Sequence, residues 1–181
     1  MLKTLSDIAK ILHSEKLTWA VGGSFLLHHY NLIENPNDID IIVDEKDAPL
    51  LNEMLSPLGT RKEAEKREPF HTVTFTKYKM NQTDFDIMGG FAIGHEEGIY
   101  KLVFTEESVV DSKNINGVEV PLCALEDWYV FYWLLPNKQE KAYLIENYFL
   151  SNGVKHPKLL KRALTQPLPQ AVKERINKLN S

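Results

Sequence analysis

The segment Asp38-Ile-Asp-Ile-Ile-Val43 alternates acidic and aliphatic residues and then becomes wholly apolar. Alternation with a period of two is typical of a β-strand, because successive side chains point to opposite faces of the sheet. On such a strand Asp38 and Asp40 leave the same face, while the aliphatic end lies in the core. The segment therefore predicts a strand with a buried end and two carboxylates at its polar edge.

A second acidic strand is predicted at residues 83–88, Thr-Asp-Phe-Asp-Ile-Met. If it lies beside the first strand, Asp84 or Asp86 completes a cluster of three acids. Two like charges ~4 Å apart repel by about 4 kcal/mol at an effective dielectric near 20, so such acids stay apart in water or gather around a cation. Carboxylate oxygens are suited to Mg²⁺. A magnesium site and a set of solvated strand-end acids are the two alternatives at this point.

A glycine turn, Gly22-Gly23-Ser24, follows the short apolar strand predicted at Leu17–Val21 and opens a predicted helix. Two glycines let the backbone approach a ligand closely, and a serine hydroxyl beside free helix N–H groups can donate to phosphate oxygens. No Gly-Lys-[Ser/Thr] sequence follows, so the turn is not a P-loop. Taken alone, Gly-Gly-Ser is also a common turn without a ligand.

Strands are expected mainly in the first two thirds of the chain and helices in the last third. In the first part of the chain, periodicity and turn residues predict a helix over Leu2–Leu12, a helix after Asp47 through Leu55, and a solvated loop or helix face over Arg61–Glu68. A hairpin of Phe70–Tyr78 with the second acidic strand follows, and then a turn at Asn116-Gly117 before a strand at 118–120. The last part is predicted to contain a helix from Ala124, a helix over Lys138–Leu150, and a basic helical piece over His156–Leu179 interrupted by Pro167 and Pro169. Residues 94–111 give no clear pattern. The fold class is α+β, with a core over residues 1–121 and a helical part over 122–181 that packs on it as a single unit.

The 181 residues include 25 acids against 21 lysines and arginines, for a net charge of −4. This mild excess of acids argues against a broad surface for duplex nucleic acid. One cysteine, Cys123, excludes an internal disulfide and a cysteine-based zinc site. Because no apolar run suits a signal peptide or a membrane span, we expect a soluble, cytoplasmic protein without a membrane partner. The oligomeric state, a homodimer included, stays open.

The order of these motifs resembles that of the DNA polymerase beta-like nucleotidyltransferase superfamily. Within it, the chain is most similar to small bacterial and archaeal nucleotidyltransferases related to the lincosamide- and aminoglycoside-modifying enzymes. Besides the glycine turn and the first two acids, three segments carry the resemblance: Trp19-Ala-Val21, Asp86-Ile-Met-Gly89 and Val120-Pro-Leu-Cys-Ala-Leu-Glu126. The resemblance spans roughly residues 1 to 150. It implies a two-layer nucleotidyltransferase fold, a mixed sheet flanked by helices, with a helical C-terminal part.

The resemblance also implies a role for each acid. Asp38 and Asp40 would bind Mg²⁺, with two ions expected, and Asp86 would be the third carboxylate and the general base. Asp86 is preferred to Asp84 because Ile-Met-Gly-Gly-Phe follows it, as in the family. The residues implied to hold the triphosphate of a nucleotide such as ATP are Gly22, Gly23 and Ser24.

Glu126 and two lysines complete the set of candidate residues. Glu126, at the start of the helical part, would line the acceptor side, or it is a simple helix-start acid. Many relatives carry a lysine in the following helix and then Gly-Arg and Lys-Asp, whereas here the stretch reads Tyr-Trp-Leu-Leu-Pro-Asn-Lys over residues 132–138. Lys138 or Lys141 would supply the cation for the phosphates; otherwise both are surface lysines.

The function implied is an Mg²⁺-dependent transfer of a nucleoside monophosphate from a nucleoside triphosphate to a hydroxyl acceptor, with release of pyrophosphate. The alternative is a non-catalytic member of the same fold that binds a nucleotide or a protein, such as an antitoxin-like regulator. Three carboxylates in one place favour the enzyme, and the missing lysine pattern favours the alternative. The acceptor and the base preference stay open.

Overall fold

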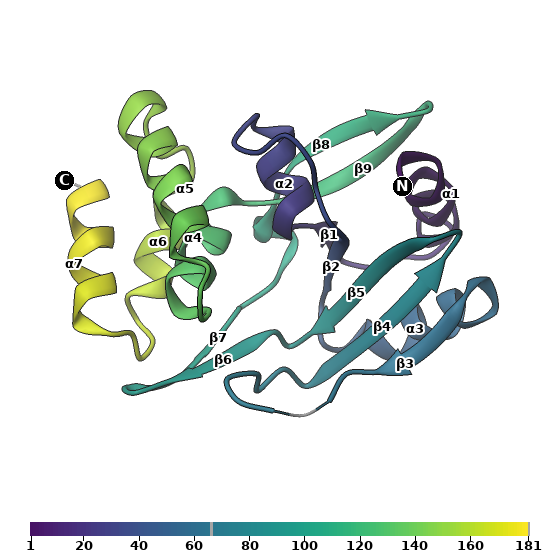
Figure 1. Ribbon diagram of the computed structural model, residues 1–181, viewed down its shortest axis with the longest axis horizontal. Helices are drawn as coiled ribbons and strands as arrows, with labels where there is room; N and C mark the ends of the chain where they lie inside the picture. Colours follow the sequence, from purple (N-terminus) through teal and green to yellow (C-terminus); the bar gives the residue numbers. More distant parts are fainter. Residues whose placement is uncertain (66, 181) are drawn as a thin grey trace.

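A seven-stranded mixed sheet forms the centre of the molecule in the computed structural model, which describes residues 1–65 and 67–180 (Figure 1). Its strand order is β3-β4-β5-β2-β1-β9-β8, and β6 and β7 form a separate two-stranded ribbon. The strands are β1 (Trp19–Val21), β2 (Ile39–Val43), β3 (Thr60–Glu63), β4 (Thr74–Met80), β5 (Thr83–Gly89), β6 (Ala92–His95), β7 (Gly98–Lys101), β8 (Val109–Ile115) and β9 (Val118–Cys123). The helices are α1 (Leu2–Leu12), α2 (Gly23–His29), α3 (Ala48–Leu55), α4 (Leu125–Leu134), α5 (Gln139–Asn152), α6 (Pro157–Ala163) and α7 (Gln170–Leu179), with short 3₁₀ turns η1 (Ser56–Leu58) and η2 (Glu106–Ser108).

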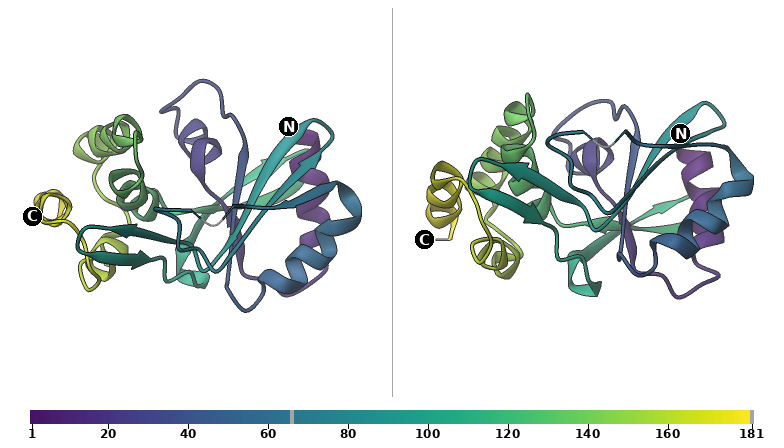
Figure 2. Two further views of the ribbon diagram at one scale, coloured as in Figure 1. Left: turned by 60° about the horizontal axis from the view of Figure 1, so that its bottom comes forward. Right: turned by 90° about the horizontal axis from the view of Figure 1, so that it is seen from below.

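Helices cover both faces of the sheet, as expected for an α+β fold. Figure 2 shows α1 and α3 on one side of the strands, and α2 with the C-terminal helices on the other. The alternation of β2 explains this arrangement, because Ile39, Ile41 and Val43 are fully buried and lie on the face that meets α3. The opposite face of the same strand carries the acids, toward α2.

The hairpin of β4 and β5 has a two-residue turn, Asn81-Gln82, in which both residues have positive φ. Such turns match the right-handed twist of paired strands and fix the register between them. Met80 therefore pairs with Thr83, and the pairing continues back to Thr74 opposite Gly89. The hairpin was predicted, but its first strand begins at Thr74 rather than at Phe70.

The prediction of a solvated loop or helix face over Arg61–Glu68 is wrong for its first residues. Thr60–Glu63 form β3, which pairs with β4 at the edge of the sheet, and all four residues are exposed. An exposed edge strand carries charges on both faces, so its sequence lacks the apolar alternation by which strands are recognised. The β6–β7 ribbon begins at Ala92 and lies mostly in the region, 94–111, that gave no sequence pattern.

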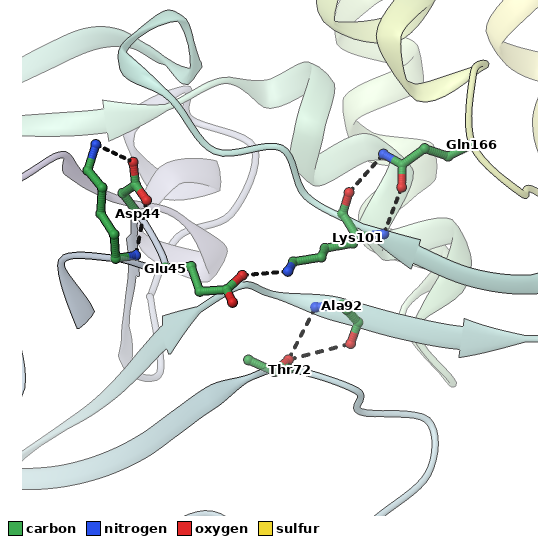
Figure 3. Close-up of polar contacts among 7 residues, drawn as sticks. Asp44, Glu45, Thr72, Ala92, Lys101 and Gln166 are labelled. Carbon is green, nitrogen blue, oxygen red and sulfur yellow. Dashed lines mark hydrogen bonds and ion pairs between the residues drawn. The ribbon is translucent and has the colours of Figure 1, made fainter. Parts of the chain in front are cut away.

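Helix α4 packs against β6 of the ribbon and against α2, and α5 and α6 pack on α4 (Figure 1). Figure 3 shows one of the links: the Gln166 side chain donates to the Lys101 carbonyl at 2.8 Å and accepts from its N–H at 3.0 Å. Lys101 in turn pairs with Glu45 in the loop after β2. The division at residue 121 stays a prediction, but these contacts connect the two parts. Among the described residues, no helix is long and apolar enough to span a membrane.

Candidate active site

Three carboxylates meet at the centre of the sheet. β2 and β5 are adjacent and parallel, and their register places Asp40 directly opposite Asp86. Asp38 lies two residues before Asp40 and therefore on the same face. One oxygen from each of Asp38, Asp40 and Asp86 lies within 4.8 Å of the other two. Strand pairing thus brings together the three acids that the sequence singled out, while Asp84 is exposed at the outer end of β5.

The cluster brings three carboxylates together where burial disfavours their charged form. Burial raises the pKa of Asp40 well above its usual range, and the carboxylates of Asp38 and Asp86 raise it further. Burial also raises the pKa of Asp86, although Lys77 acts in the opposite direction. A cation bound among these oxygens would remove both the repulsion and the cost of desolvation. The donor set consists of carboxylate oxygens, so it fits a hard divalent ion such as Mg²⁺.

Gly23 borders the cluster closely. Its φ is +59°, and a Cβ built on it would lie 1.7 Å from Oδ2 of Asp40. At Gly22 a Cβ would lie 2.1 Å from Nε1 of Trp128 on α4. Both glycines are therefore required for space, and Gly23 also for its left-handed conformation, so the backbone of the turn passes directly beside an acid of the cluster.

Ser24 is buried and its hydroxyl holds the first acid. It donates to Asp38 at Oδ1 (3.3 Å) or at the backbone carbonyl (3.4 Å), and it accepts from the N–H of Asn37 at 3.2 Å. The hydroxyl therefore orients Asp38 at the start of β2. Its contact with a triphosphate stays a prediction.

Lys141 and Lys138 differ in their position relative to the acids. Lys141, on α5, is half-buried, and its ammonium lies 5.4 Å from the centre of the Tyr132 ring. Burial and Lys138 lower the pKa of Lys141, while the carboxylates of Asp40 and Asp38 act to raise it. Lys138 is exposed where α5 begins. Of these two lysines, Lys141 is the one within electrostatic reach of the cluster.

Lys77 is a member of the site that sequence reasoning missed. It lies opposite Asp86 in the β4–β5 pairing, and its Nζ is 2.6 Å from Oδ2 of Asp86. The row Lys77, Asp86, Asp40 therefore crosses three adjacent strands. The signal was present in the sequence, because a hairpin with a two-residue turn at Asn81-Gln82 must pair residue 77 with residue 86.

A sequence profile of the aminoglycoside-2''-adenylyltransferase family matches residues 4–143. The chain belongs to this family. Its members are nucleotidyltransferases, so the chain is an enzyme of that class rather than a non-catalytic regulator. A search of curated protein sequences found no significant match.

Solved structures show the same fold. The Thermotoga maritima protein TM1012, assigned to the nucleotidyltransferases, is 23% identical, with a TM-score of 0.61 over 83% of this chain and 93% of its own. ANT(2'')-Ia in complex with adenylyl-2''-tobramycin is 14% identical, with a TM-score of 0.58 over 96% and 97% of the two chains. The lincosamide antibiotic adenylyltransferase LnuA, bound to lincomycin, is 16% identical, with a TM-score of 0.51 over 80% and 95%. These similarities confirm the predicted nucleotidyltransferase fold.

The environment of Glu126 differs from that of Asp38, Asp40 and Asp86 in the acid cluster. It is 2% exposed, and its Oε1 accepts a hydrogen bond of 2.9 Å from the N–H of His156. The side chain therefore connects the first turn of α4 to the start of α6. Its role as an acceptor contact stays a prediction.

A cavity of about 260 Å³ opens beside the third acid. Phe70 and Phe75, whose ring centres are 5.7 Å apart, form an apolar part of its wall. Lys77 and Asp86 form the end nearest the acid cluster, and the charged side chains of Lys62 and Arg67 also line it. Asp86 therefore faces the cluster on one side and a cavity on the other.

Proposed function

We propose that this family member transfers a nucleoside monophosphate from a nucleoside triphosphate to a hydroxyl group of a small acceptor, in a reaction that requires Mg²⁺. The observation that carries the proposal is the set of three carboxylates, with ligand atoms within 4.8 Å, on two parallel strands beside a glycine turn. Three acids in so small a space are costly to the fold without a cation.

Asp38, Asp40 and Asp86 would hold the metal. Two bound Mg²⁺ ions would supply charge neutralisation for the attacking and leaving oxygens of an in-line displacement. The backbone of Gly22 and Gly23, which borders the cluster, and the ammonium of Lys141 would contact the triphosphate. Lys141 would therefore replace the lysine that many relatives carry in the helix after the Leu-Glu element.

Asp86 is the proposed general base because it borders both the cluster and the cavity. The acceptor hydroxyl oxygen forms a bond to the α-phosphorus, and its proton passes to the Asp86 carboxylate. The bond between the α-phosphorus and the bridging oxygen breaks, and pyrophosphate leaves with that electron pair. The cavity bounded by Phe70 and Phe75 is the proposed position of the acceptor.

The test is an assay of pyrophosphate release with Mg²⁺, each of the four nucleoside triphosphates, and a panel of hydroxyl acceptors that includes aminoglycosides and lincosamides. We expect acceptor-dependent release with at least one combination, and a loss of about a thousandfold or more in Asp40→Asn. Asp84→Asn is the matched control, since Asp84 is exposed on the same strand. Turnover in Asp40→Asn equal to that of the unmodified chain would refute the assignment of the carboxylates.

A further inference from the structure

The ion pair between Lys77 and Asp86 joins the acid cluster to the wall of the neighbouring cavity. The Lys77 side chain is 48% exposed and that of Asp86 is 14% exposed, so the ammonium approaches the buried carboxylate from the solvent side. The next pair on the same face of the hairpin, Lys79 opposite Asp84, has the same register but makes no ion pair among the described residues. The contact at Lys77 is therefore a property of the site and not of the strand pairing alone.

Lys77 also has a second partner. Its ammonium lies 4.9 Å from the centre of the Phe75 ring, within the range of a cation–π contact. Phe75 lies two residues earlier on the same face of β4 and lines the cavity. The ammonium can therefore move away from Asp86 and remain against the ring, so release of the carboxylate does not leave the charge without a partner.

A metal ion that bound Asp86 would lie about 2 Å from one of its carboxylate oxygens. The ion would therefore lie only a few ångströms from the Lys77 ammonium, which is paired with the same carboxylate. Two cations at that separation repel, and the repulsion is strong where one partner is buried. The carboxylate can therefore be neutralised fully by one of the two cations, but each weakens the binding of the other.

We propose that Lys77 is a built-in counter-cation of the acid cluster, which neutralises Asp86 in the metal-free enzyme and lowers the affinity of the cluster for free divalent metal ions. This inference rests on the proposed function, since it takes the three acids as the metal ligands. A complex of a metal ion with a triphosphate has a net negative charge, which attracts the Lys77 ammonium. Lys77 therefore opposes free metal more strongly than it opposes the metal–nucleotide complex.

The experiment measures binding of Mn²⁺ alone at pH 8, from the electron paramagnetic resonance signal of the free ion. We expect Lys77→Met to bind Mn²⁺ about tenfold more tightly than the unmodified enzyme, because one repelling charge is removed. Lys77→Arg keeps the charge and should retain the original affinity, as should the matched control Lys79→Met. Lys77→Gln provides a second neutral variant with a polar side chain. With Mn²⁺ and a non-hydrolysable nucleotide together, the gain should shrink to less than about threefold.

Unchanged or weaker Mn²⁺ binding in both Lys77→Met and Lys77→Gln would overturn the inference. If Asp40→Asn abolishes the binding in the same titrations, the metal binds at the acid cluster and the proposed function stands. If the unmodified enzyme binds no Mn²⁺ with or without nucleotide, the proposed function fails as well. The two failures are therefore distinguishable from one set of titrations.

Discussion

At the scale of single residues, the absence of a side chain is as important to this site as the presence of three carboxylates. Gly23 has a left-handed backbone and lies so close to Asp40 that a Cβ would overlap its Oδ2. Ser24, the next residue, holds Asp38 through its hydroxyl. Two consecutive residues of the turn thus set the positions of two consecutive acids on the face of β2.

Gly23→Ala should damage the site more than its backbone strain alone explains. We expect a loss of unfolding free energy of about 2–4 kcal/mol, from a strained φ together with a forced movement of Asp40, and a loss of metal-dependent activity. Gly117→Ala is the matched control, because Gly117 has a φ of +80° but no atom within 4 Å of a built Cβ. Chemical denaturation of both variants measures the difference, and equal losses would show that Asp40 is not displaced.

At the scale of elements, α4 joins the sheet to the C-terminal helices through two consecutive buried acids. Glu126 accepts from the backbone before α6, and Asp127 lies 3.7 Å from the guanidinium of Arg162 on α6. Arg162 also donates to the hydroxyl of Ser108 in η2. Asp127 is 3% exposed, and its Oδ2 has no hydrogen-bond partner within the described residues.

This environment makes the contact between α4 and α6 dependent on pH. Burial raises the pKa of Asp127 from 3.8 to about 7, with Arg162 acting against the rise and Glu126 adding to it. Because the folded chain favours the protonated acid, the free energy of unfolding should fall as pH rises from about 4 through 7. The shift corresponds to a loss of at most about 4 kcal/mol.

Between pH 5 and pH 8.5, the free energy of unfolding of Asp127→Asn should therefore fall less than that of the unmodified chain. Urea denaturation at both pH values, with a chelator present, measures the two losses. Asp7→Asn is the control, because Asp7 is a half-exposed acid on α1. Parallel pH curves for Asp127→Asn and the unmodified chain would contradict the expected role of the buried carboxyl.

At the scale of the whole molecule, the N-terminal core and the helical part are connected at several separate places. The glycine turn packs against Trp128 on α4, and Gln166 makes two hydrogen bonds with β7. Within the helical part, Arg175 on α7 stacks 4.1 Å from the Trp133 ring and pairs with Glu146. Since the contacts of the glycine turn and of Gln166 span the predicted division at residue 121, we expect one cooperative unit.

Cooperative unfolding can be tested with the three tryptophans, of which Trp19 lies in β1 and the other two in α4. In Trp19→Phe, fluorescence reports on the helical part and its contact with the glycine turn, while circular dichroism reports on the whole chain. We expect the two signals to give the same midpoint in urea, as for a two-state transition. Separate midpoints would show that the helical part unfolds independently, and the unmodified chain serves as the reference.

Much of the core could be predicted because its strands carry strong alternation. Ile39, Ile41 and Val43 lie on the face that packs against α3, and the acids lie on the other face. Lys77 could have been predicted from the hairpin register, but exposed lysines on strands carry no signal of their own. β3 and the β6–β7 ribbon could not be predicted, because an exposed edge strand and a short ribbon bury too few side chains to impose a pattern.

The two-residue turn at Asn81-Gln82 has an effect at a distance on the chemistry of the sheet. Since it sets the pairing of β4 with β5, it determines that Lys77 lies opposite the third carboxylate, three residues or about 10 Å along the strands from the pair Met80–Thr83 that closes the turn. One inserted residue that left the turn two residues long would bring Thr76 or Tyr78 to that position, and both belong to the opposite, buried face. The length of a solvent-exposed loop therefore affects the charge at the acid cluster, although no side chain of the turn reaches it.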